Sequence, residues 1–380
     1  MSNPGPTAAV KKQATVYVVD DDPAIREATD SLLRSAGLSV ETFASAQDFL
    51  DGKPGDASGC VVLDVGLPGL SGLDLQRELI QANIHIPVIF VTGNGDIPTS
   101  VRAMKAGAVE FLTKPFRDDD LLGAIQQAIE RDQAAQLKIS ERERELRAAA
   151  DIQQGLMALT IPQLPFAALT GKNLSCTEIG GDFFMAVTVE ETLVAVIADV
   201  SGKGISAAVM ASLLQGMIHE DLLARVSLPG IARNVNEFFC RRDLGSKYAT
   251  FVIVCVPPNG EIEYLNCAHV PPLVVNAQNG VRRLRESNVP VGLLPNVSYQ
   301  SAKFHLSAGD RIILVTDGVT EAEGPGGDFY GDERLEESAA RGMTAGQIFT
   351  SVRQFCADHP MSDDCTVLGL DYLGNSDMSF

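Results

Sequence analysis

Short apolar runs alternate with helical stretches between residues 16 and 112, and this alternation limits the fold more than any other feature. The runs are of strand length and apolar at nearly every position: 16–19, 60–63, 88–91 and 108–112. Pro23 begins the first helical stretch, which ends before Gly37. Strands that are apolar on both faces need helices on both sides, which is the arrangement of a parallel sheet. We therefore predict an α/β unit built on a doubly wound parallel sheet.

Polar side chains follow these strands where they end. They are the acids at 20–22, Asp64, Thr92 and Lys114. The carboxyl ends of parallel strands meet at one edge of the sheet, which is where ligands bind. Carboxylates gathered there repel one another unless a hard cation lies among them. Lys114 supplies a charge, and Thr92 a hydroxyl, suited to a phosphoryl oxygen.

Ordered motifs carry a resemblance to a known domain. They are Val-Val-Asp-Asp-Asp at 18–22, Leu-Asp-Val-Gly-Leu-Pro-Gly at 63–69, Val-Thr-Gly at 91–93 and Lys-Pro-Phe at 114–116. The segment 14–132 resembles the receiver domain of bacterial response regulators, which implies a five-stranded, flavodoxin-like fold. By this resemblance Asp64 accepts a phosphoryl group from a histidine kinase or phosphotransfer protein. The other implied roles are Mg²⁺ binding by Asp20, Asp21, Asp64 and the Gly66 carbonyl, phosphoryl binding by Thr92 and Lys114, and a rotamer switch at Phe111.

The stretch 133–160 is rich in good helix formers and is expected to be a helical linker. Ile139 and Leu146 are seven residues apart, as are Ala149 and Leu156. This spacing favours a signalling helix or a short parallel coiled coil that would pair two copies of the chain. A solvated spacer helix is the alternative. Residues 1–13 are expected to be disordered, and 374–380 to form a C-terminal tail.

Residues 161–373 show a different pattern, in which strands and helices no longer alternate one for one. Strand candidates are 193–198, 249–256, 262–268, 273–276, 311–316 and 366–370, with a hairpin turn at 257–260. Helices are expected at 205–224 and 344–358, and apolar residues four apart predict the buried face of the first: Ile205, Val209, Leu213 and Met217. We expect an α+β fold of two packed sheets with helices outside.

Acids lie at the edges of these strands: Asp182, Asp199, Asp317, Asp363 and Asp364. No histidine has the spacing of a zinc site, and oxygen ligands suit Mg²⁺ or Mn²⁺. Two such ions a few ångströms apart can clamp a phosphate for in-line hydrolysis. Ser201 has no evident catalytic partner, so a covalent intermediate is not expected, and His269 is expected to be structural.

Five motifs here also resemble a known family: Gly180-Gly-Asp-Phe-Phe, Ala198-Asp-Val-Ser-Gly-Lys-Gly, Ala268-His-Val-Pro-Pro, Val315-Thr-Asp-Gly-Val-Thr-Glu-Ala and Asp363-Asp-Cys-Thr. They resemble the sporulation-type branch of PP2C-like, metal-dependent serine/threonine phosphatases, and the segment from Ile152 to Leu164-Pro165 resembles its N-terminal part. The resemblance implies that Asp199 and the Val200 carbonyl, Asp317 and Asp363 bind two Mn²⁺ or Mg²⁺ ions. Asp182 would act through a water ligand of a metal, and Asp364 would bind or support the site.

Composition limits the partners. The net charge of −19 argues against binding to nucleic acid, which needs a basic face. Seven scattered cysteines and the lack of an apolar signal segment favour a cytoplasmic protein without membrane spans. We expect a response regulator whose phosphatase acts on a phosphorylated anti-sigma-factor antagonist. The alternative is a non-catalytic adaptor that binds a sigma factor or anti-sigma protein through a phosphatase-like domain.

Overall fold

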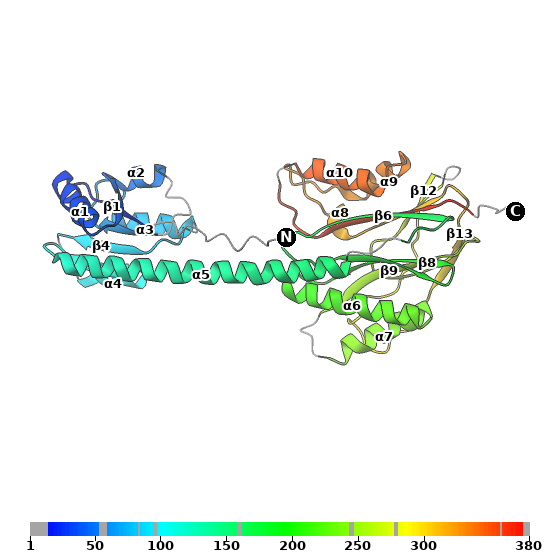
Figure 1. Cartoon of the computed structure of the whole chain (residues 1–380). Coiled ribbons are helices and arrows are strands. Elements are labelled where there is room, and N and C mark those ends of the chain that lie inside the picture. Colours follow the sequence, from blue (N-terminus) through cyan, green and yellow to red (C-terminus); the bar gives the residue numbers. More distant parts are fainter. Residues whose placement is uncertain are drawn as a thin grey trace, which may run out of the picture. The chain divides into compact units, whose positions relative to one another are not determined.

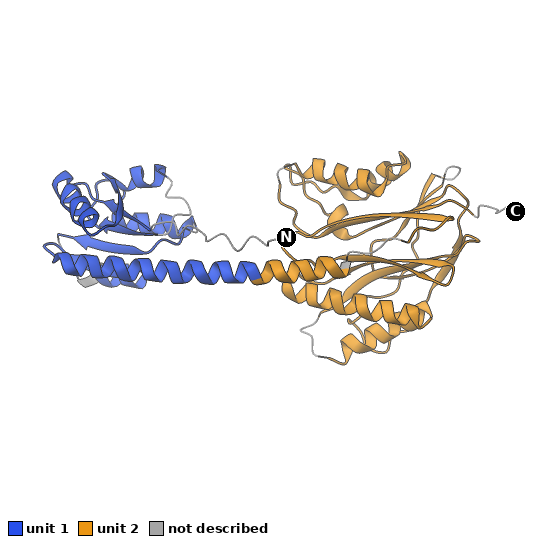
Figure 2. Ribbon diagram, in the orientation of Figure 1, with its two compact units in different colours: residues 1–144 blue, residues 145–380 orange. Residues whose placement is uncertain are grey.

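The computed structural model describes residues 14–52, 59–82, 84–93, 97–157, 162–242, 247–276, 280–357 and 359–374, without the side chains of 97–99 and 157. The chain forms two compact units, residues 1–144 and 145–380 (Figure 2). Residues 1–13, expected to be disordered, lie outside the described part, as does most of the expected tail. The domain boundaries expected at 132, 160 and 373 remain predictions.

The first unit is built on a parallel sheet. Its strands are β1 (Thr15–Val19), β2 (Ser39–Phe43), β3 (Gly59–Asp64), β4 (Val88–Thr92) and β5 (Glu110–Thr113). They are paired in parallel in the order β2-β1-β3-β4-β5. The predicted flavodoxin-like fold is therefore confirmed. The order places the ends of β1 and β3 side by side, with β4 next to β3.

Helices cover both faces of this sheet: α1 (Pro23–Ser35), α2 (Ala46–Asp51), α3 (Gly72–Gln81) and α4 (Ile97–Lys105). One apolar core includes Val16 and Leu33, and the other includes Phe49 and Leu75. The Asp22 carboxylate accepts a hydrogen bond from the Ala24 amide at 2.8 Å. An acid at the end of β1 therefore also caps the start of α1.

Helix α5 (Asp118–Met157) is 40 residues long and contributes residues to both units. In the first unit Ile125 is buried in the core, and Asp132 Oδ2 accepts a hydrogen bond from the Gly59 amide at 3.1 Å. Further along, Ile139 is 50% exposed and Leu156 is 53% exposed. Both belong to the spacing of seven, so an apolar stripe is open to solvent where a coiled coil would cover it. Pairing of two copies remains a prediction.

The second unit contains two antiparallel sheets. Its strands are β6 (Ala167–Leu174), β7 (Phe183–Val189), β8 (Thr192–Val200), β9 (Ala249–Val256), β10 (Glu261–Cys267), β11 (Leu273–Asn276), β12 (Gly280–Arg283), β13 (Ala302–His305), β14 (Arg311–Val315) and β15 (Cys365–Tyr372). One sheet has the order β13-β10-β9-β8-β7 and the other β12-β11-β14-β15-β6 (Figure 1). Ile197 and Val252 of the first pack in one core with Leu314 and Leu368 of the second. The predicted pair of packed sheets is confirmed.

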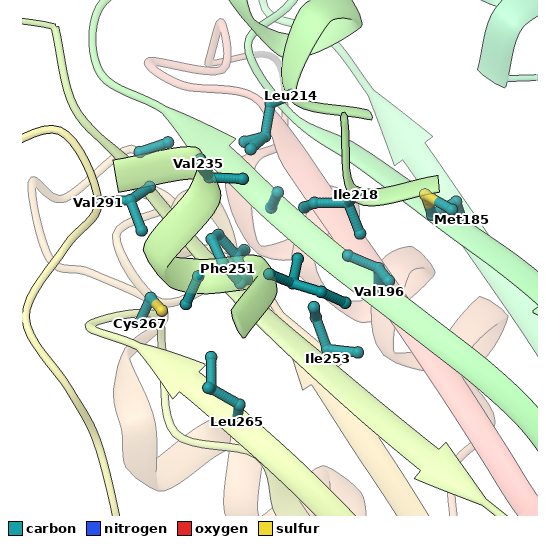
Figure 3. Packing of buried hydrophobic residues seen from close by; sticks show 14 of the residues in the cluster. Met185, Val196, Leu214, Ile218, Val235, Phe251, Ile253, Leu265, Cys267 and Val291 are labelled. Atoms are coloured by element: carbon teal, nitrogen blue, oxygen red, sulfur yellow. The ribbon is translucent and has the colours of Figure 1, made fainter. Parts of the chain in front are cut away.

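Helices lie outside both sheets of this unit. The first is covered by α6 (Ile205–Leu223) and α7 (Leu228–Cys240), the second by α9 (Gly331–Ala340) and α10 (Ala345–Cys356), and α8 (Asp317–Thr320) is a short turn after β14 (Figure 1). Figure 3 shows Leu214, Ile218 and Val235 of α6 and α7 against Phe251 and Ile253 of β9. Within the described residues, no helix combines the length and apolar character needed to span a bilayer.

The prediction of which face of α6 is buried is wrong. Ile205 is 55% exposed and Val209 62% exposed, whereas the helix buries another row of side chains, Ala207, Ala211, Leu214, Ile218 and Leu222. Helix α6 is apolar nearly all round, so spacing alone did not select a face. The observed face carries alanines, which allow the helix to lie close to the sheet.

Candidate functional site

The first candidate site lies at the carboxyl edge of the parallel sheet. Lys114 Nζ lies 2.6 Å from Asp20 Oδ2 and 3.4 Å from Asp64 Oδ1. Carboxylate oxygens of Asp20, Asp21 and Asp64 lie within 4.8 Å of one another. Three acids with one ammonium leave excess negative charge, so the oxygen donors fit a hard divalent cation such as Mg²⁺.

The electrostatics of this edge follow from the shared lysine. Burial raises the pKa of Asp64, Lys114 opposes this shift, and Asp20 adds to it. The hydrogen bond with Asp20 and the charge of Asp64 raise the pKa of Lys114 despite its partial burial. Lys114 is therefore held charged between two carboxylates.

The remaining predicted residues of the first unit lie around this pair. Thr92 is buried at the end of β4, where its carbonyl accepts a hydrogen bond from the Lys114 amide at 2.7 Å. A Cβ at Gly66 would lie 3.5 Å from Asp64 Oδ2, so the Gly66 main chain borders the carboxylate. Phe111 lies on β5, with its ring 6.4 Å from that of Phe90. The structure therefore brings Thr92 and Gly66 to the acids and places Phe111 on β5, which is separated from β3 by β4.

The second candidate site draws acids from both sheets of the second unit. Asp182 precedes β7 and Asp199 lies near the end of β8, whereas Asp317 follows β14 and Asp363 precedes β15. Burial raises the pKa of Asp199 to about 7, helped by the nearby charges of Asp317 and Asp363. Burial likewise raises the pKa of Asp317, with Asp363 adding to the shift. The charges of these carboxylates therefore act on one another, and divalent metals bind such sets of oxygen donors.

Asp182 is the most deeply buried of these acids. Its Oδ2 accepts hydrogen bonds from Thr316 Oγ1 at 2.7 Å and Thr366 Oγ1 at 2.8 Å. Burial, followed by the charge of Asp199, raises its pKa well above the ordinary value, and the two hydroxyls oppose that rise. One oxygen of Asp182 is therefore oriented by the second sheet.

Asp364 holds the main chain around Asp182. Its Oδ1 accepts from the Cys176 amide at 2.8 Å, and its Oδ2 from the Gly181 amide at 2.7 Å and the Asp182 amide at 3.3 Å. A Cβ at Gly180 would overlap Asp364 Oδ2, so only glycine allows this approach. These bonds support the loop, and ligand atoms of Cys176, Asp363 and Asp364 also lie within 4.8 Å of one another, so Asp364 remains a candidate metal ligand as well.

Asp363 lies at a more open point of the site, whereas Val200 is fully buried. The Asp363 side chain is 44% exposed, and its Oδ2 lies 3.2 Å from Lys203 Nζ. Lys203 also donates to the Ser362 carbonyl. A Cβ at Gly181 would lie 2.8 Å from the Val200 carbonyl oxygen, so that oxygen faces the loop carrying Asp182.

His269 is buried beside the second site. Its Nδ1 lies 2.8 Å from Thr250 Oγ1, and Thr250 is paired directly with Asp199 across β8 and β9. The Asn266 side chain bonds both the amide and the carbonyl of His269. Burial lowers the pKa of His269 to about 4, so the ring is neutral near pH 7. These contacts suit a structural residue.

Two family models match the chain. The model described as "Response regulator receiver domain" matches residues 16–126, and the model described as "Stage II sporulation protein E (SpoIIE)" matches residues 190–373. The chain therefore contains a receiver domain and a SpoIIE domain. The matched stretches contain every acid of the two candidate sites except Asp182.

Relatives of the receiver are similar at the level of sequence. Nodulation protein W of Bradyrhizobium diazoefficiens is 57% identical over 128 residues, 34% of this chain and 56% of that protein. Response regulator protein TodT of Pseudomonas putida is 53% identical over 118 residues, 31% of this chain and 52% of that protein. The chain therefore spans about half the length of these curated relatives.

Solved structures resemble the SpoIIE domain. The structure of the RsbU and RsbW domains of Rv1364c from Mycobacterium tuberculosis has a TM-score of 0.50 and 25% identity, covering 56% of this chain and 61% of that one. The SiaA-PP2C domain of Pseudomonas aeruginosa has a TM-score of 0.52 and 20% identity, covering 63% and 99%. The second likeness shows a shared PP2C-like fold.

Sequence reasoning missed three side chains of the SpoIIE site. Thr316 and Thr366 orient Asp182, and Lys203 pairs with Asp363. Each of the three lies inside a motif that was chosen for a neighbouring acid or glycine, so the motifs already contained the residues that orient the acids. Their contacts join residues far apart in sequence, which spacing alone does not reveal.

Proposed function

We propose that this protein is a response regulator whose receiver domain controls a metal-dependent protein serine/threonine phosphatase. The observation that carries the proposal is the convergence of Asp182, Asp199, Asp317 and Asp363 from two sheets, with burial and mutual repulsion raising the pKa of the first three. A protein keeps such mutually repelling buried acids where a cation compensates them.

In the receiver domain, Asp64 is the phosphoryl acceptor. Asp20, Asp21, Asp64 and the Gly66 carbonyl would hold Mg²⁺. Lys114, held between Asp20 and Asp64, would bind the phosphoryl oxygens together with Thr92. Phe111 would change rotamer when Asp64 is phosphorylated. The donor is a histidine kinase or a phosphotransfer protein.

In the SpoIIE domain, Asp199, the Val200 carbonyl, Asp317 and Asp363 would hold two Mn²⁺ or Mg²⁺ ions. When bound, such ions activate water and neutralise the charge of a phosphate ester. Asp182 is oriented for this site by Thr316 and Thr366, and Asp364 fixes the loop that carries it. The substrate is phosphoserine or phosphothreonine on a partner protein, and the resemblance favours an anti-sigma-factor antagonist.

The test is Mn²⁺-dependent hydrolysis of p-nitrophenyl phosphate and of a phosphorylated antagonist protein by the full chain, with and without acetyl phosphate. Native protein should turn over both substrates, and Asp199→Asn should reduce turnover to background. The exposed Glu191→Gln is the matched control and should behave as native. Absence of metal-dependent turnover by the native chain in either condition would favour the non-catalytic adaptor.

A further inference from the structure

A buried glutamine lies near the C-terminal end of α5. Gln153 is 7% exposed, whereas its neighbour Ile152 is 68% exposed and Gln154 is also exposed. A primary amide carries two donors and two acceptor lone pairs, and burying it without partners is unfavourable. The position of Gln153 therefore depends on what its amide contacts.

Both ends of that amide contact Gly180. Gln153 Nε2 donates to the Gly180 carbonyl at 2.8 Å, and the Gly180 amide donates to Gln153 Oε1 at 3.2 Å. The side chain thereby pairs with one glycine as a neighbouring strand would. Gly180 lies two residues before Asp182, so the contact reaches the main chain of the SpoIIE site.

Among the described residues, the other side chain that bonds to the main chain of 180–182 is Asp364. Gly180 and Gly181 have no side chains, and Asp364 holds the amides of Gly181 and Asp182. A Cβ at Gly180 would lie 2.5 Å from Ser175 Oγ, so the loop is also closely packed against Ser175. Gln153 therefore forms hydrogen bonds with the main chain of Gly180, and Asp364 accepts hydrogen bonds from the amides of Gly181 and Asp182.

The last turns of α5 are also tied to α6. Gln215 Nε2 donates to the Leu156 carbonyl at 3.0 Å. This bond satisfies a carbonyl of the final turn, one of those that a helix cannot pair internally. The end of α5 is thus fixed to α6 at Leu156 and to the site loop at Gln153.

We propose that Gln153 is a positioning residue that fixes the loop carrying Asp182 in the SpoIIE site. The inference rests on the proposed function, because the task of Asp182 is defined there. Gln153 and Gly180 both lie outside the stretches that the two family models match. Gln153 also belongs to the helix that contributes Ile125 to the core of the receiver domain, so the loop is bonded directly to the element that joins the two domains.

The decisive variant is Gln153→Met in the full chain. Methionine keeps the length and helix propensity of glutamine and removes both hydrogen bonds. Gln154→Met is the matched control, since it makes the same change on the exposed neighbour. We expect the Mn²⁺ dissociation constant from calorimetry to rise about tenfold in Gln153→Met, as for loss of other outer contacts of metal sites. Amide hydrogen exchange across 176–186 should become faster in Gln153→Met and stay native in Gln154→Met.

Steady-state kinetics provide a second readout. Gln153→Met should lower kcat for p-nitrophenyl phosphate and leave KM unchanged, because the proposed role of Gln153 is to position Asp182 and not to contact the substrate. Gln153→Glu keeps an acceptor for the Gly180 amide and places a carboxylate against the Gly180 carbonyl. It should therefore fail to restore native exchange, and it tests the idea if the methionine variant does not fold.

A folded Gln153→Met protein with native Mn²⁺ affinity and native exchange across 176–186 would overturn the inference. If the native chain showed no hydrolysis at all, the proposed function would fail while hydrogen exchange still tested the role of Gln153.

Discussion

The Thr316 hydroxyl donates to Asp182 Oδ2 at 2.7 Å, and this bond joins the end of β14 in one sheet to the start of β7 in the other. The Thr316 hydroxyl in turn accepts a hydrogen bond from the Thr366 amide at 3.0 Å. The orientation of the most buried acid of the SpoIIE domain is therefore set by the packing of the two sheets against each other.

Replacing Thr316 by valine should weaken the site, and it also removes the acceptor of the buried Thr366 amide. Valine has the same shape and leaves Asp182 with one hydroxyl donor in place of two, so the pKa of Asp182 should rise further. We expect the Mn²⁺ dissociation constant, measured by calorimetry, to rise about tenfold. Thr350→Val removes a hydroxyl bonded within α10 and is the matched control. Equal Mn²⁺ affinity in both variants would contradict the orienting role of Thr316.

Replacing Asp199 by asparagine should stabilise the metal-free chain. The folded pKa of Asp199 is about 7, above the ordinary value of 3.8. The folded chain therefore holds the proton more tightly than the unfolded chain, so the stabilisation from the protonated carboxyl is complete at pH 3 and is lost as the pH rises through 7. The gain in Asp199→Asn should therefore be small at pH 4 and largest above pH 7, where a shift of this size corresponds to at most about 4 kcal/mol.

Urea unfolding of the SpoIIE transition in EDTA, at pH 5 and pH 8, measures this difference. Adding Mn²⁺ should raise the unfolding free energy of the native chain and leave Asp199→Asn unchanged. Glu191→Gln should follow the native chain at both pH values. A loss of stability in Asp199→Asn at pH 8 would show that other groups of the protein already balance the negative charge of the Asp199 carboxylate.

His269 should make the SpoIIE domain less stable in acid. The folded pKa of His269 is about 4, below the ordinary value of 6.5. The neutral ring therefore contributes to the stability of the fold fully above pH 6.5, and this contribution is lost as the pH falls through 4. The full loss corresponds to about 3 kcal/mol. Unfolding free energies of the native chain and His269→Gln between pH 7 and pH 4 should show a shallower decline in the variant. Parallel declines would indicate that the folded ring can be protonated freely.

Replacing Lys114 by methionine should impair phosphorylation of the receiver domain. The pKa of Asp64 should rise because its neighbouring cation is lost, and Asp20 loses its 2.6 Å partner. A hydrogen bond to a charged group contributes about 1.5–3 kcal/mol, so we expect transfer from acetyl phosphate to slow at least about tenfold. Phosphate-affinity gels measure the rate, and the exposed Lys105→Met is the control. Transfer at the native rate in Lys114→Met would remove Lys114 from the proposed phosphoryl site.

Sequence patterns best predicted strands that are apolar at most of their positions. The strands at β3, β4, β9 and β11 were located to within one residue because every position or every second position is apolar. Strand β2 was not located, since only Val40 of its five residues is buried. Strand β12 was missed for a similar reason, because it contains no fully buried residue.

The acids of both sites were named from the sequence, and the contacts that orient them were not. Asp182 and Asp64 follow or precede strands and stand out as charges next to apolar runs. The partners of Asp182 come from 134 and 184 residues further along the chain, and such pairs depend on how two sheets pack. The face of α6 was wrong for a related reason, because tertiary packing chooses among apolar faces that the sequence makes nearly equal.

The gathering of buried acids at Asp182, Asp199 and Asp317 also bears on how such a domain changes under mutation. Each of these carboxylates has its pKa raised by burial and by its neighbours, so the fold would be more stable with neutral residues in their place. A lineage released from catalysis would gain stability by discarding them, and random substitution would seldom restore the set. Under the proposed function, the three aspartates would be a record of selection for chemistry acting against the preference of the fold.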